Sequence, residues 1–169
     1  MHTTLDISKE HKRNLVTLAR YLYDLKPDEN MKFDMYDFAH KSTPEDDWAI
    51  GPFALVSKQH EDCKTSACAV GHAVFLFPPL EDNWVEYTER VFGISGTRDG
   101  RLRDAFAFMF GGFWNKIDNS PRGAAQRIIF ALTDGVPHSD DFCTDEQLRY
   151  WEDQYVRLTL DNIPSEEDL

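Results

Sequence analysis

The sequence has few cysteines, few basic residues and no long hydrophobic run, and each shortage excludes a class of protein. Only 3 of its 169 residues are cysteine, and an odd number argues against the disulfide framework of a small secreted domain. No apolar stretch approaches the roughly 18 residues that a transmembrane helix needs. The first residues, MHTTLDISKEHKRN, lack the apolar core of a signal peptide. We therefore expect a cytoplasmic protein with reduced thiols and no membrane interaction.

Basic residues are scarce as well, with 18 Lys and Arg against 30 Asp and Glu, for a net charge of −12. The excess is concentrated in residues 136–169, where ten acidic and two basic side chains give −8. Such a field repels phosphate backbones, so direct nucleic-acid binding is not expected. An acidic surface that meets a basic protein is one alternative, and the chain would then be a protein–protein inhibitor.

Apolar and aromatic residues, in contrast, are plentiful. They make up 41% and 13% of the chain, and include 12 Phe and 4 Trp. A chain of this length and composition can form a packed core without a metal, a disulfide or a cofactor, and none is predicted. We expect one globular domain over residues 1–160, followed by an acidic, flexible tail over residues 161–169.

Helix signals dominate the pattern along the chain. Apolar residues recur at three- and four-residue spacing in several segments, and capping residues or stops mark their ends. These markers are Ser8 and Pro27 for a first helix, Gly93 for a second, Ser120-Pro121 and Asp134-Gly135 for a third, and a Thr144–Gln147 capping box for a last.

The centre of the fold is predicted at residues 65–77, which are almost all apolar or small. A helix without a polar face is a buried helix. An aromatic helix over residues 101–117, weakened at Gly111-Gly112, is expected to pack against it. The alternating segment MKFDMYDF indicates a minor extended or β element near residues 31–38. The prediction is a mainly α, single compact domain of about six helices around a buried central helix at 65–77.

The stretch HEDCKTSACAVGHA, residues 60–73, is the richest in reactive side chains. Cys63, Cys68 and His72 have a C-x4-C-x3-H spacing, and the last two share one face of a helix. A structural zinc ion needs four ligands, so a metal site is an alternative that requires one more. The candidates for the fourth ligand are Cys143, His60 and His138.

Cysteine catalysis is a second alternative for this stretch. Cys63 precedes the predicted helix, whose N-terminus would stabilise a thiolate. His138 would be the general base of such a cysteine-dependent hydrolase, oriented by Asp140 or Asp141. Two acidic residues directly before Cys63 act against this, because negative charge raises a thiol pKa.

The favoured interpretation is a binding site for an anionic ligand. Cys68 and His72 are read first as core residues, because free cysteine is among the most buried residue types. The start of the predicted helix, in contrast, offers hydroxyl and N–H groups to an anion, and arginines with nearby aromatic rings suit a nucleotide-like molecule. The residues assigned to this site are Thr65, Ser66, His72, Arg122 and Arg127.

Three segments, FDMYDF, CKTSACAVGHA and WNKIDNSPRGAAQRIIFAL, resemble an uncharacterised family of small bacterial and phage proteins with a C-G-T-x-A-C-A-x-G-H/W-A motif. The resemblance covers about residues 15–135, and Lys64 stands where the motif has glycine. It implies a phage or mobile-element accessory protein in a bacterial host cell and no assigned chemistry. Such a protein would bind a nucleotide-like anion or a host protein without catalysis, with counter-defence as one possible role.

Overall fold

The computed structural model describes residues 4–26, 31–33, 39–41, 52, 65–96, 100–165 and 167–169. Six α-helices lie in these residues, so the predicted mainly α, single-domain fold is confirmed. Within the same residues, no helix is both long and apolar enough to cross a bilayer.

The core is built around two helices, α1 (Lys9–Asp24) and α6 (Pro121–Thr133), which pack along each other. Helix α6 also contacts α5 (Arg101–Phe110) and α7 (Asp145–Tyr155). Ten of its residues, from Pro121 to Ala131, are buried, including Gln126 and Arg127. A helix surrounded on all sides must bury its polar residues too, and this makes α6 the central helix of the domain.

The prediction of a buried central helix over residues 65–77 is therefore wrong. Residues Thr65–Ala67 form strand β3, and helix α3 is confined to Ala69–Ala73. Strand β3 pairs in parallel with β1 (Met31–Phe33) and antiparallel with β2 (Ala39–Lys41), in the order β1-β3-β2. A short apolar run carries no period that separates a strand from a helix, and the helical reading of residues 65–67 failed for this reason. Of the predicted extended element at 31–38, residues 34–38 lie outside the described part of the chain.

The aromatic segment 101–117 is also divided. Helix α5 ends at Phe110, with extended backbone at Gly111, and a 3₁₀ helix, η1, continues over Gly112–Lys116. The predicted weakness at Gly111-Gly112 is thus a true break. Phe108 lies at the centre of an aromatic cluster, with ring centroids of Trp114, Phe130, Phe142 and Trp151 5.7–6.1 Å away. The aromatic helix packs on α6 and η2 (Ser139–Phe142), and its predicted packing against residues 65–77 is not the main contact.

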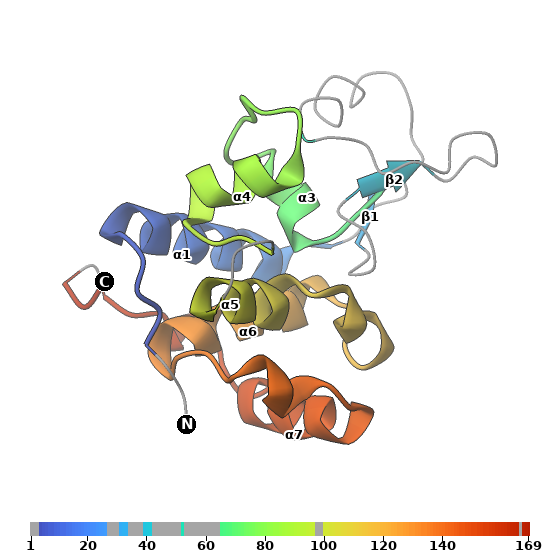
Figure 1. Ribbon diagram of the computed structural model, residues 1–169, viewed down its shortest axis with the longest axis vertical. Helices are drawn as coiled ribbons and strands as arrows, with labels where there is room; N and C mark the ends of the chain where they lie inside the picture. The colour runs from blue at the N-terminus through green and yellow to red at the C-terminus, as the bar shows by residue number, and fades with distance from the viewer. Residues whose placement is uncertain are drawn as a thin grey trace.

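Figure 1 shows the elements in three tiers. Helix α3, helix α4 (Trp84–Phe92) and the strands lie on one side, α7 lies on the opposite side, and α1, α5 and α6 lie between them. A last 3₁₀ helix, η3 (Leu160–Asn162), contacts α6. The Lys12 ammonium donates to the carbonyl of Leu169 over 3.3 Å, while the predicted flexibility of residues 161–169 stays a prediction.

The capping residues lie where the sequence predicted them. The side chains of Ser8, Ser120 and Thr144 accept hydrogen bonds from backbone N–H groups three residues later, and the Thr144–Gln147 capping box is complete. Gly93 ends α4 in the left-handed region with φ 68°. These local signals hold because their hydrogen bonds need only neighbouring residues.

One partly exposed ion pair, Glu81–Arg90, gives the fold a pH dependence. Arg90 donates to both carboxylate oxygens of Glu81 and, over 3.1 Å, to the carbonyl of Pro78. The hydrogen bond with Arg90 lowers the pKa of Glu81 below its ordinary value. A carboxylate with a lowered folded-state pKa stabilises the fold above its unfolded pKa and loses that contribution as the pH falls through the folded one.

We therefore expect Glu81→Gln to lower the free energy of unfolding at pH 7 and to lower it by less at pH 3. Urea unfolding across this range measures the difference, and substitution of the exposed Glu167 by Gln is the control. If Glu81→Gln lowers the free energy of unfolding equally at both pH values, the assigned shift in the Glu81 pKa is wrong.

Candidate functional site

The residues assigned to an anion site from the sequence lie in different environments. Thr65 and Ser66 belong to strand β3, so the helix N-terminus predicted there does not exist. Helix α3 begins at Ala69, with Cys68 as its N-cap, and is only five residues long. The backbone N–H groups of Thr65 and Ser66 are therefore not part of a helix start.

His72 and Cys68 are both buried, as their interpretation as core residues predicted. The His72 ring lies among the rings of Tyr21, Phe33 and Phe75, with centroids 5.7–6.2 Å away. Helix α3 packs on α1 at this position. His72 therefore packs with aromatic residues in the core.

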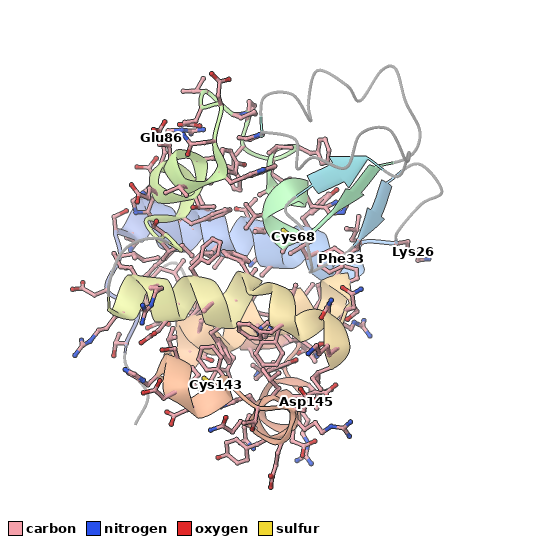
Figure 2. The ribbon with its side chains drawn as sticks, turned by 45° about the vertical axis from the view of Figure 1, so that its right-hand side comes forward. Lys26, Phe33, Cys68, Glu86, Cys143 and Asp145 are labelled. Carbon is pink, nitrogen blue, oxygen red and sulfur yellow. The ribbon has the colours of Figure 1, made fainter. Side chains whose placement is uncertain are left out.

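The metal alternative gains no support from the described residues. No set of three His, Cys, Asp or Glu side chains in them is placed to hold a metal ion. Figure 2 shows Cys68 beside α3 and Cys143 near α7, on opposite sides of α5. Cys143 therefore cannot complete a site with Cys68 and His72. Cys63 and His60 lie outside the described residues, so the catalytic alternative at Cys63 stays untested.

Arg122 and Arg127 differ in exposure. Arg122 is exposed, and its guanidinium stacks over the ring of Tyr23 at 4.5 Å. Arg127 is 0% exposed and lies over the rings of Trp114 at 4.6 Å and Tyr155 at 5.5 Å. A side chain with no exposed surface cannot meet a ligand from solvent, so of the two only Arg122 faces outward.

Arg127 belongs to a polar cluster with Asp118, Ser120 and Tyr155, in which Arg127 and Tyr155 are buried. Arg127 Nη1 lies 3.5 Å from Asp118 Oδ2 and donates to the Tyr155 hydroxyl over 3.2 Å. That hydroxyl donates in turn to Asp118 Oδ2 over 3.2 Å, and Ser120 Oγ donates to Asp118 Oδ1 over 2.6 Å. Burial raises the pKa of Tyr155 and keeps it protonated as a donor. The geometry is that of a structural ion pair bridged by a hydroxyl group.

A cavity of about 530 Å³ lies elsewhere, at the start of α5. Three segments distant in sequence line it: residues 4–6 before α1, residues 101–104 in the first turn of α5, and residues 136–141 after α6. The lining combines apolar and polar side chains: Thr4, Leu5, Asp6, Arg101, Leu102, Asp104, Val136, Pro137, His138 and Asp141. Its volume is within the range of about 300–1,000 Å³ that is typical of small-molecule sites. We name it the α5 pocket.

Asp104 is the buried polar residue of this pocket. Its side chain is 8% exposed, and its Oδ1 has no hydrogen-bond partner among the described residues. Its other oxygen, Oδ2, lies 4.0 Å from His138 Nε2. The position in the first turn of α5 offsets part of the charge, because the helix dipole favours anions there. A buried acceptor without a donor is nonetheless costly, and native proteins retain few of them outside functional sites.

His138 stands at the mouth of the pocket with its side chain 63% exposed. Its Nδ1 accepts a hydrogen bond from the backbone N–H of Asp140 over 3.3 Å, which assigns the ring proton of the neutral form to Nε2. Nε2 then faces Asp104. The carboxylate of Asp140 also lies near this ring, with Oδ2 3.5 Å from Nδ1. The catalytic role predicted for His138 stays untested, because Cys63 lies outside the described residues.

Comparisons of the chain with protein-family models, with curated proteins and with solved structures found no match. The family resemblance of the cysteine segment thus stays an expectation, and the function must be argued from the site itself.

Sequence reasoning missed the α5 pocket because its walls come from three separate segments. Asp104 follows two arginines in RLRDAF and has the pattern of an ordinary first-turn acid. The one sequence signal is the position of His138 and Asp141 after the stop at Asp134-Gly135, and we interpreted it as part of the catalytic alternative and, for His138, also of the metal alternative. Burial of Asp104 depends on tertiary packing, which periodicity does not report.

Proposed function

We propose that the chain is a non-enzymatic binding protein that holds a small organic molecule in the α5 pocket. The Oδ1 atom of Asp104, which has no hydrogen-bond partner in the described part of the chain, carries the proposal, because a ligand that donates a hydrogen bond would satisfy it. Buried Leu5, Val136 and Pro137 supply an apolar wall around that polar point. A mostly apolar cleft with a few placed polar groups is the usual composition of a small-molecule site.

The proposal accommodates the accessory role that the family resemblance implies, since an accessory protein can act by binding alone. It does not use the predicted anion site. His72, Arg122 and Arg127 do not line the α5 pocket. A nucleotide-like ligand or host-protein partner at these residues and at Thr65 and Ser66 stays a prediction. The cysteine-dependent hydrolase and the acidic protein–protein inhibitor also stay alternatives.

A fragment screen read by protein NMR tests the location of binding without assuming a ligand. We expect saturable fragments to shift the backbone amides of residues 4–6, 101–104 and 138–141. Shifts at residues 65, 66, 72, 122 and 127 instead would support the anion site predicted from the sequence. Hits scattered over the surface, with none in the α5 pocket, would refute the proposed function.

A further inference from the structure

We infer that the ligand of the α5 pocket is an organic cation with N–H donors, such as an amidine, guanidine or primary amine. This inference rests on the proposed function and adds the chemical class of the ligand. Its basis is the buried carboxylate of Asp104, whose two oxygens have different surroundings. Oδ2 faces His138, and Oδ1 is left without a partner among the described residues.

The charges around the pocket also favour a cationic ligand. Among the described residues that line it, Asp6, Asp104 and Asp141 are acidic and Arg101 is the one basic residue. These three carboxylates and one guanidinium give the described part of the lining a formal charge of −2. Because the whole chain carries −12, a cation is attracted to this region and an anion is repelled.

The cation is organic and not a metal ion. A hard cation needs several oxygen ligands within about 2.0–2.6 Å of it. The described residues, however, contain no set of three side chains placed to ligate a metal. Buried Leu5, Val136 and Pro137 instead offer contact to a carbon framework next to the carboxylate. A ligand with an N–H donor on an apolar framework would both hydrogen-bond to Oδ1 and cover these side chains.

Three probes of nearly equal shape separate charge from shape: benzamidine, benzamide and benzoate. Calorimetric titration gives each dissociation constant, and NMR shifts of residues 101–104 and 138–141 report whether binding is in the pocket. We expect benzamidine to bind there about tenfold more tightly than benzamide, or better, because a charge-assisted hydrogen bond is about twice as strong as a neutral one. We expect benzoate not to bind, because the carboxylates of the pocket repel an anion.

The variant Asp104→Asn should weaken benzamidine about 10- to 100-fold and leave benzamide nearly unchanged. Asp145→Asn is the matched control, because Asp145 is also a first-turn acid, on α7, but lies outside the pocket. The melting temperature of ligand-free Asp104→Asn should equal or exceed that of the wild type, since the variant removes a buried charge.

The outcomes separate the two proposals. If benzoate or benzamide binds in the pocket as tightly as benzamidine, the inference of a cation fails and the binding function stands. If benzamidine binds equally to the wild type and to Asp104→Asn, the inference also fails. If none of the three probes, nor any fragment of the screen, shifts residues of the α5 pocket, the proposed function and the inference fail together.

Discussion

Replacing Asp118 by Ala is expected to lower the free energy of unfolding by about 3–5 kcal/mol. The reason lies in Arg127, which is 0% exposed and has Asp118 as its carboxylate partner. Arg127 Nε and Nη2 already lack hydrogen-bond acceptors among the described residues. Without Asp118, a buried guanidinium would keep only two aromatic rings and one hydroxyl group. This is a large fraction of the roughly 5–15 kcal/mol by which a domain is stable.

Urea unfolding followed by tryptophan fluorescence measures this loss. Asp153→Ala is the control, since Asp153 is an exposed acid on α7, the helix that also carries Tyr155, and it should change the stability by less than about 0.5 kcal/mol. The double variant Asp118→Ala/Arg127→Met should recover most of the loss, because an apolar side chain needs no counter-charge. If Asp118→Ala lowers the free energy of unfolding by less than about 1 kcal/mol, the Asp118–Arg127 pair contributes little to the stability of the core around α6.

The second large effect is expected for Gly123→Ala, which should destabilise the protein although replacing glycine by alanine in a helix usually stabilises. In a helix interior, alanine in place of glycine normally stabilises by about 1 kcal/mol. At Gly123, however, an added Cβ would lie 1.5 Å from Asp118 Oδ2 and 2.2 Å from its Cγ. The carboxylate would have to leave its position and its bonds to Arg127, Ser120 and Tyr155. We expect a loss close to that of Asp118→Ala, about 3–5 kcal/mol.

A double-mutant cycle makes this prediction specific. In the Asp118→Ala background the obstructing carboxylate is gone, so Gly123→Ala should be neutral or stabilise by up to about 1 kcal/mol. Gly123→Ala is therefore expected to destabilise the wild type but not the Asp118→Ala variant. A destabilisation of similar size in both backgrounds would mean that Gly123 is needed for a reason other than the close approach of Asp118.

The parts of the fold that depend on neighbouring residues could be predicted from the sequence. Ser8, Ser120 and Thr144 cap their helices, and Gly93 ends α4, because each of these contacts spans only a few residues. The mainly α fold of one domain followed from these local signals.

Contacts between distant segments could not be predicted in this way. The run at 65–77 was read as the central helix because it is apolar, yet α6, with two arginines and a glutamine, is the helix that the domain buries. The sequence predicts Arg127 to be a ligand-binding residue because nothing in SPRGAAQRII reveals that Asp118 pairs with it and that the Tyr155 hydroxyl accepts its hydrogen bond. Asp104 and the α5 pocket depend on three segments meeting in space, and the sequence alone does not show that they meet.

A crystal structure of the protein soaked with benzamidine tests the central claim most directly. We predict the probe in the α5 pocket, with an amidinium nitrogen about 2.7–2.9 Å from Asp104 Oδ1 and the phenyl ring against Leu5, Val136 and Pro137. An α5 pocket without the probe, or a probe whose amidinium group points away from Asp104, would contradict the account.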